Sequence, residues 1–86
     1  MTPLSPAERK NMRHALGLDV ADAPYRNRFV SYGADEIWEG LVARGLAVCP
    51  PFPTKTQQRL YAVTDRGMAA LGVAPLDGLE PSERYP

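Results

Sequence analysis

The stretch that decides the fold is residues 60–71, which read LYAVTDRGMAAL. Its first part is aromatic and β-branched and, with the residue before it, predicts a strand over 59–63. Thr64 follows, and its hydroxyl can accept a hydrogen bond from the free amides at the start of a helix. The spacing therefore predicts a short helix that is capped by Thr64, runs through Leu71 and stops at Gly72.

Upstream of this strand, residues 34–44 carry the strongest helical period of the chain. Apolar side chains recur there at spacings of three and four, as one face of a helix requires. They are Ile37, Trp38, Leu41 and Val42. Gly45 ends this helix, and a strand over 46–48 follows. The polar, proline-rich connection 49–58 joins the two strands, so we expect a β-hairpin with a long loop.

The N-terminal part opens with a helix signal at residues 5–8, SPAE. Ser5 can accept from the third amide of the helix, the proline suits the first helical position, and Glu8 can reach back to the cap. The helix is expected to run to Leu16, because Gly17 offers a left-handed stop.

Residues 25–32 are aromatic and β-branched enough to predict a further strand. Strict alternation would place Tyr25 with Phe29 on one face of this strand. Arg26 and Arg28 would then lie on the other face.

The last stretch, 73–86, holds three prolines and no helical period. We expect it to be a flexible tail next to a single domain over 1–72.

The chain has 86 residues, of which ten are basic and ten acidic, so the formal net charge is zero. Neutrality removes the overall electrostatic argument for nucleic acid and leaves only local basic patches.

Composition also argues against several classes of protein. One small domain leaves little material for a deep substrate pocket, so an enzyme is not expected. A lone Cys49 and a lone His14 supply neither a disulfide nor a zinc set, and no cofactor or metal is expected. No run approaches the roughly 18 to 20 apolar residues of a membrane span, and residues 1–10 lack a signal-peptide pattern. These observations predict a cytoplasmic protein without a membrane partner.

Two segments together resemble the second half of a winged-helix domain. They are LVARGL at 41–46 and, after a variable polar loop, LYAVTDRGMAAL at 60–71; the resemblance covers residues 35–72. In winged helix-turn-helix regulators a helix ends in glycine, a strand and a wing loop follow, and threonine opens the next helix. RHALGL at 13–18 and PYRNRFV at 24–30 further resemble small phage and prophage proteins, a likeness that implies no established activity.

One departure from that family concerns the helices. A full winged helix-turn-helix places two helices between the first strand and the wing, whereas only 34–44 has room here. The resemblance therefore implies a reduced winged helix of the α+β class, with the order α-β-α-β-β-α, a long-looped wing hairpin and a flexible C-terminal tail.

The basic residues are the candidates for contact with nucleic acid, through the first helix, the strand that follows and the wing. They are Arg9, Lys10, Arg13, Arg26, Arg28, Lys55 and Arg59. Tyr25 and Tyr32 interleave with them. On this reading the protein is a phage-type regulatory module that binds DNA as a monomer or homodimer. Solvated arginines that bind nothing are the alternative.

The acids of the second helix favour a different class, a protein-interaction module such as an accessory factor or an inhibitor of a host system. A helix that enters the major groove would bring these acids against phosphates, so conventional readout by this helix is disfavoured. The candidate protein interface consists of Asp35, Glu36, Glu39 and Phe52. The sequence leaves both classes open.

Overall fold

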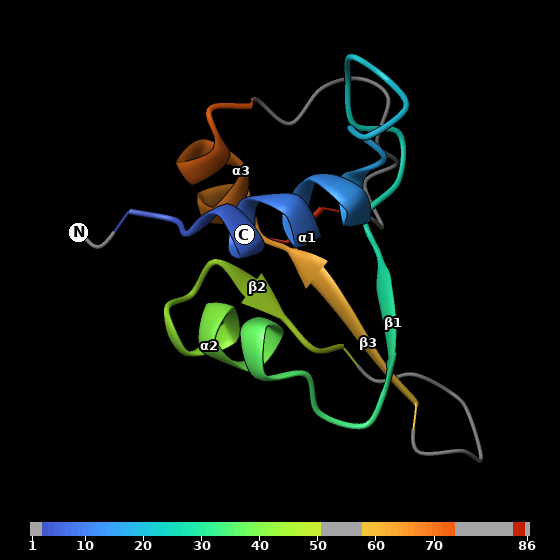
Figure 1. Ribbon diagram of the computed structural model, residues 1–86, viewed down its shortest axis with the longest axis vertical. Helices are drawn as coiled ribbons and strands as arrows, with labels where there is room; N and C mark the ends of the chain where they lie inside the picture. Colours follow the sequence, from blue (N-terminus) through green and yellow to red (C-terminus); the bar gives the residue numbers. More distant parts are fainter. Residues whose placement is uncertain (1–2, 51–57, 74–83, 86) are drawn as a thin grey trace.

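The computed structural model describes residues 3–50, 58–73 and 84–85, which form three helices and a three-stranded antiparallel sheet (Figure 1). The order is α1 (Pro6–Leu16), β1 (Phe29–Tyr32), α2 (Glu36–Ala43), β2 (Ala47–Val48), β3 (Gln58–Val63) and α3 (Asp65–Leu71). The predicted α+β class and the predicted order of elements are confirmed. Lys55, Phe52 and most of the loop and tail lie outside the described residues.

The first helix has the predicted caps at both ends. The Ser5 hydroxyl accepts from the Glu8 amide at 3.1 Å, and the Glu8 carboxylate accepts from the Ser5 amide at 2.7 Å. Gly17 ends α1 in the left-handed conformation, with φ of 80°. These local hydrogen bonds satisfy amides and carbonyls that the helix itself leaves unpaired.

The other two helices differ little from the prediction. Asp35 is the N-cap of α2 and accepts from the Trp38 amide at 3.1 Å, so the helix begins after Asp35 rather than at residue 34. Thr64 caps α3 by accepting from the Gly67 amide at 3.0 Å, and Gly72 ends that helix as predicted.

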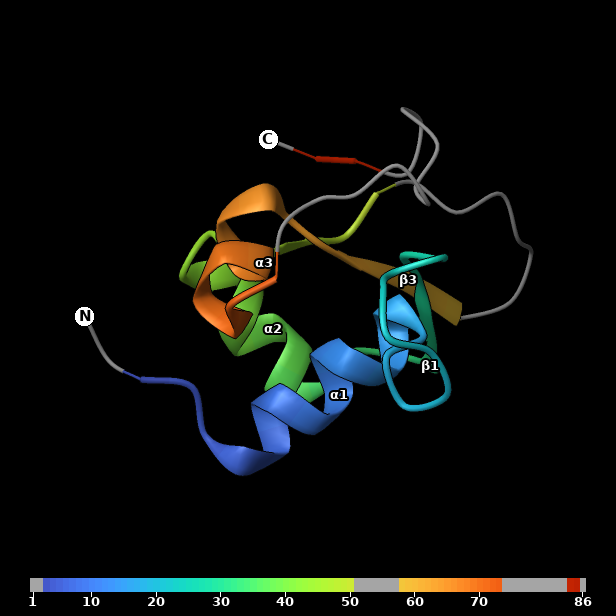
Figure 2. The same ribbon diagram turned by 90° about the horizontal axis from the view of Figure 1, so that it is seen from above.

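The sheet has the strand order β1-β3-β2, with β3 in the centre. Phe29 lies opposite Tyr61 in the first antiparallel pair, and Ala47 lies opposite Val63 in the second. Helices α1 and α2 pack against each other on one face of this sheet, and α3 packs at the end of β3 (Figures 1 and 2).

The first strand is shorter than predicted, because it begins at Phe29 and not at residue 25. In the observed register the main chain of Asn27 would lie opposite Val63. Instead the Asn27 side-chain amide donates to the Val63 carbonyl at 2.9 Å, and its oxygen accepts from the Val63 amide at 2.8 Å. A buried side chain thus takes the place of a strand residue.

The main chain on either side of Asn27 is held by α1 and not by the sheet. The Tyr25 amide donates to the Leu16 carbonyl, and the Arg28 amide donates to the Ala15 carbonyl. The predicted alternation of faces from Tyr25 onward is therefore wrong, because alternation holds only where the chain is a strand.

The core lies between the sheet and the helices α1 and α2. Trp38 of α2 stacks on Tyr61 of β3, with ring centroids 5.7 Å apart, and lies 5.3 Å from the Phe29 ring. Met12 and Leu16 of α1 complete the layer as fully buried side chains. Large aromatic side chains each bury a large apolar area, which a chain this small needs for its core.

Candidate nucleic-acid interface

The sheet has an outer face that α1 and α2 leave uncovered, and β1 forms much of it. Val30 is 44% exposed and Tyr32 is 84% exposed. Phe29, on the opposite face of the strand, packs against the core. Arg28 is exposed as well. Side chains two residues apart share a face of a strand, so Val30 and Tyr32 face solvent together.

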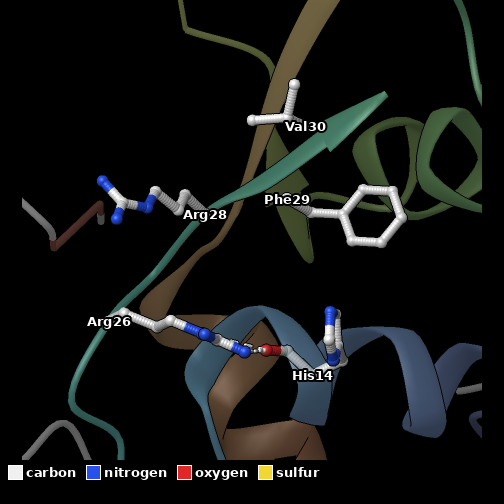
Figure 3. Close-up of a pocket in the computed structure, with 5 residues that line it drawn as sticks. All are labelled: His14, Arg26, Arg28, Phe29 and Val30. Atoms are coloured by element: carbon white, nitrogen blue, oxygen red, sulfur yellow. Dashed lines mark hydrogen bonds between the residues drawn. The ribbon is translucent and has the colours of Figure 1, made fainter. Parts of the chain in front are cut away.

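A hollow of about 240 Å³ lies where β1 meets the end of α1 (Figure 3). It is lined by His14, Arg26, Arg28, Phe29 and Val30. Figure 3 shows the two arginines pointing in different directions, Arg26 toward His14 and Arg28 away from α1. The structure therefore brings two predicted basic residues to one hollow but gives them different surroundings.

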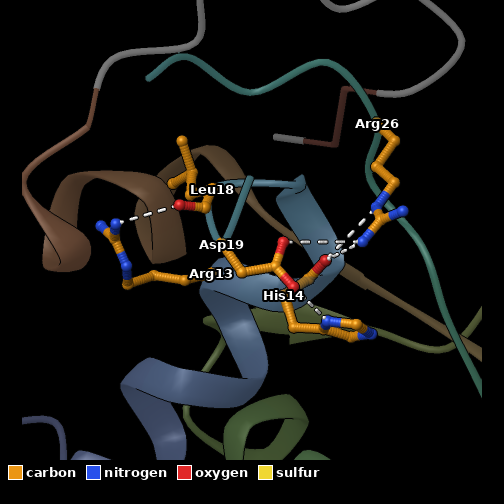
Figure 4. Close-up of polar contacts among 5 residues, drawn as sticks. All are labelled: Arg13, His14, Leu18, Asp19 and Arg26. Atoms are coloured by element: carbon orange, nitrogen blue, oxygen red, sulfur yellow. Dashed lines mark hydrogen bonds and ion pairs between the residues drawn. The ribbon is translucent and has the colours of Figure 1, made fainter. Parts of the chain in front are cut away.

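Arg26 is held by the C-terminal end of α1. Its Nε and Nη2 atoms donate to the His14 carbonyl at 3.3 and 2.8 Å, and Nη2 lies 3.8 Å from the Asp19 carboxylate (Figure 4). The guanidinium also lies over the Tyr25 ring, 5.4 Å from its centroid. A cation at the carbonyl end of a helix is stabilised by the helix dipole, so this arginine has a structural role.

Two further side chains belong to the same cluster at the end of α1. Arg13 donates to the Leu18 carbonyl at 3.2 Å, from the other side of the helix end than Arg26 (Figure 4). His14 Nδ1 lies 2.8 Å from the Asp19 carboxylate. The hydrogen bond from His14 holds the pKa of Asp19 below its ordinary value. Arg13 and Arg26 are thus engaged within the fold.

The side chains of the remaining predicted cations that the structure describes form no hydrogen bond or ion pair with its described residues. They are Arg9, Lys10, Arg28 and Arg59, all exposed. Arg59 lines a separate hollow with Gly33, Ala34 and Gln58, at the end of the sheet where Tyr32 lies opposite Gln58. The free cations are therefore spread over α1, the residue before β1, and β3, and do not form one compact patch.

Tyr61 binds two of the residues predicted for a protein interface, Glu39 through its carboxylate and Asp35 through its main-chain amide. The Tyr61 hydroxyl donates to the Glu39 carboxylate at 2.5 Å and accepts from the Asp35 amide at 3.1 Å. Burial, and then the hydrogen bond to Glu39, raise the pKa of Tyr61 above its ordinary value. Asp35 and Glu39 therefore connect α2 to the sheet, and Glu36 is the exposed acid that remains.

Val30 is a surface residue that the sequence reasoning missed. A strand with an inward Phe29 ring puts Val30 outward, on the face that the predicted alternation gives to Arg26 and Arg28. The signal that could have found it is the alternation counted from the core residue Phe29.

Other kinds of site are not seen among residues 3–50, 58–73 and 84–85. No three His, Cys, Asp or Glu side chains gather there in a way that could hold a metal ion. None of the helices described is both long and apolar enough to span a membrane. No protein-family model matches the chain, and comparisons with curated proteins and with solved structures found no match either.

Proposed function

We propose that the protein is a small non-enzymatic regulatory module of phage or prophage type, and that it contacts nucleic acid through exposed basic residues. The fold we propose for it is a reduced winged helix. The order α-β-α-β-β-α supports this, as does the antiparallel pairing of β2 with β3 around a long connection in the place of a wing.

The observation that carries the proposal is the setting of Arg28. It is an exposed cation without an ion-pair partner in the described part of the chain, and it precedes β1 on the side that solvent reaches. Tyr25 and Tyr32 are exposed on either side of it in sequence. An arginine suits a phosphate and a tyrosine ring suits a base, so this combination fits nucleic acid.

The other free cations lie at separate places on the surface. Arg9, Lys10 and Arg59 are available to phosphates, and Lys55 belongs to the loop outside the described residues. Arg13 and Arg26 are assigned to the fold instead, because they bind carbonyls at the end of α1. With few free cations and a net charge of zero, we expect modest affinity that falls as salt rises, with a slope limited by the small number of phosphates these cations can neutralise.

Fluorescence anisotropy with labelled duplex and single-stranded DNA tests the proposal. The wild type should bind at low salt, and Arg28→Glu should weaken binding to all sequences alike and reduce the salt slope by about one. Arg66→Glu is the matched control, since Arg66 is an exposed cation on α3 that lines a different hollow with Leu46, Ala69 and Ala70. No binding by the wild type at about 100 µM, the weak end of non-specific affinity, would overturn the proposal.

The apolar part of the same surface favours the second candidate, a protein-interaction module. Val30 and Tyr32 are exposed and adjacent on one face, and Glu36 is an exposed acid soon after the end of β1. A stoichiometric complex isolated from host lysate, lost with Tyr32→Ala and kept with Val20→Ala, would support this candidate. Val20 is 76% exposed and lies in the loop after α1, so it controls for the loss of an exposed apolar side chain.

A further inference from the structure

The free edge of β1 is the starting point, because β1 has β3 as its one neighbour in the sheet described (Figure 1). Val63 directs both its amide and its carbonyl toward the β1 side, where Asn27 binds them. Main-chain groups alternate in direction along an antiparallel strand, so Tyr61 and Arg59 also point toward β1. Their partners Phe29 and Ser31 point back at β3. Val30 and Tyr32 therefore direct their amides and carbonyls to the open edge.

Helix α1 closes one end of this edge. The Arg28 amide points outward by the same alternation, and it is already bonded to the Ala15 carbonyl at 3.1 Å. A new strand cannot occupy that position. The open edge is consequently limited to the stretch from Val30 to Tyr32, where two residues with outward main-chain groups flank Ser31.

We infer that this edge pairs with β1 of a second copy of the chain, antiparallel and centred on Ser31. In this register Val30 lies opposite the partner's Tyr32, and each such pair exchanges two main-chain hydrogen bonds. A two-fold axis between the two Ser31 residues relates the copies, so this pair occurs twice in the dimer. All the outward amides and carbonyls of Val30 and Tyr32 are then hydrogen-bonded. Any register centred on Val30 would push the partner's Tyr32 into the position that Ala15 occupies.

The charges next to β1 specify the antiparallel direction. Arg28 precedes the strand and Glu36 follows it, and both are exposed. Antiparallel pairing brings the basic entry of one copy toward the acidic exit of the other, whereas parallel pairing would bring like charges together. Complementary charges favour the first arrangement over the second.

The side chains at the edge support the same occupant. Val30 is 44% exposed and Tyr32 is 84% exposed, and in this register each packs beside the other across the axis. Cross-strand pairs of an aromatic with a β-branched residue are among the favourable ones in sheets. Because β1 has only four residues, the interface is small, and we expect a weak dimer with a dissociation constant of about 10 µM to 1 mM.

Cysteine cross-linking tests the register. Directly opposed residues in a non-hydrogen-bonded antiparallel pair have Cα atoms about 4.5 Å apart, which suits a disulfide. In a Cys49→Ser background, Ser31→Cys should form a covalent dimer under mild oxidation many times faster than Val30→Cys, Tyr32→Cys or the loop control Val20→Cys. Faster cross-linking of Val30→Cys would overturn the register. Equal rates for all four would overturn the pairing itself.

Sedimentation equilibrium without nucleic acid provides the second readout. The wild type should associate with increasing concentration, Val30→Lys with Tyr32→Lys should remain monomeric, and Val20→Lys should behave as the wild type. Thermal unfolding by circular dichroism checks that the variants are folded. A wild type that stays monomeric at about 1 mM would overturn the inference, whatever the result of the DNA-binding experiment.

Discussion

Asn27 determines where the first strand begins, because its buried side chain binds the amide and the carbonyl of Val63. An amide side chain carries one acceptor and one donor group in the right arrangement to imitate a main-chain peptide. It satisfies two buried groups that β1 would otherwise have to reach, and the chain on either side is free to follow α1 instead.

Replacing Asn27 by alanine should therefore destabilise the protein strongly. Two buried main-chain groups of Val63 would lose their partners, at a cost of about 1 to 3 kcal/mol for each. We expect the free energy of unfolding in urea to fall by at least about 2 kcal/mol. Asn11→Ala is the matched control, since the Asn11 side chain makes a single solvent-exposed hydrogen bond to the Ala7 carbonyl within α1 and its loss should cost less than about 0.5 kcal/mol. Equal losses for the two variants would contradict this account.

Glu8 connects the start of α1 to the end of α2. Its carboxylate accepts from the Ser5 amide and lies 3.1 Å from the Arg44 guanidinium, and these contacts hold its pKa below the ordinary value. The folded chain therefore binds this proton less tightly than the unfolded chain. The resulting stability is complete above the unfolded pKa of about 4.3 and is lost as the pH falls through the lower folded value.

Glu8→Gln should accordingly flatten the acid side of the stability profile. We expect a loss of about 0.5 to 1 kcal/mol at pH 7, with the difference from wild type shrinking as the pH falls below about 4. Urea unfolding at a series of pH values measures it. Glu36→Gln, an exposed position, controls for the loss of one negative charge. A difference from wild type that grows on acidification would show the sign to be wrong.

The helix caps can be predicted from the sequence, because the residues that form them are close together in the chain. Contacts between side chains far apart in the sequence cannot be predicted in this way. Ser5, Glu8 and Gly17 act within one turn of α1, and their spacing alone predicts the caps. Asn27 and Val63 are 36 positions apart, as are Glu8 and Arg44. Nothing in the spacing of such pairs distinguishes them from exposed polar residues.

At the scale of the elements, α3 lies close to the chain that enters β2, because Gly67 packs on Leu46. A methyl group at Gly67 would overlap the carbonyl oxygen of Leu46 and crowd the Val63 side chain. The close approach also brings the Leu46 carbonyl within reach of the Thr64 amide, at 3.1 Å. Glycine is used here for its lack of a side chain.

Gly67→Ala should lower stability, although alanine is the better helix former. The helix propensity gain of about 1 kcal/mol cannot offset an overlap with main-chain atoms that have little room to move. We expect a net loss of about 1 to 3 kcal/mol in chemical denaturation. Gly40→Ala in α2 is the reverse case: no atom lies within 4 Å of the added methyl group, so stability should rise by up to about 1 kcal/mol. Stabilisation by both substitutions would refute the close packing of α3.

The existence and order of the elements can be predicted from the spacing of apolar residues, from glycines that end helices and from the threonine that caps one. The length of β1 cannot be predicted in this way. Helices α1 and α3 end where the sequence predicts, since their stop signals are local. Strand β1 needs a partner to exist, and its partner β3 lies about 30 positions further along the chain. A strand boundary is set by tertiary hydrogen bonds, which composition does not reveal.

At the scale of the molecule, the described C-terminal residues return to the start of α3. The Tyr85 carbonyl accepts from the Asp65 amide at 2.7 Å, and Arg84 lies 3.2 Å from the Asp65 carboxylate. Tyr85 also helps to line a hollow on the outer face with Tyr25, Arg28 and Leu60. The end of the chain thus contributes to both the helix cap and the proposed surface.

Truncation after Glu83 should therefore loosen the first turn of α3. We expect the Asp65 amide to lose most of its protection from hydrogen exchange, measured by NMR, and global stability to fall by about 1 kcal/mol. Arg84→Ala keeps the Tyr85 carbonyl and removes only a partly exposed ion pair, so it should cost less than about 0.5 kcal/mol. Unchanged protection of Asp65 in the truncated chain would argue against this contact.

The sequence predicts which residues could form the candidate surface, but not which of them are available to a ligand. The basic residues are visible in the sequence, but whether a cation is free or bound depends on the fold, as at the C-terminal end of α1, where Arg13 and Arg26 bind carbonyls. The same holds for two acids at the start of α2, since the Glu39 carboxylate accepts from the Tyr61 hydroxyl and the Asp35 carboxylate accepts from the Trp38 amide. Availability for a ligand is a property of the folded arrangement.

The stack of Trp38 on Tyr61 gives the molecule an internal optical reporter. Trp38 is the one tryptophan of the chain, it is fully buried, and it lies on the opposite side of the sheet from Val30 and Tyr32. Its intrinsic emission should shift to longer wavelength when the core opens and remain unchanged when a ligand covers the outer face. Unfolding can thus be followed by intrinsic emission without interference from ligand binding at the outer face.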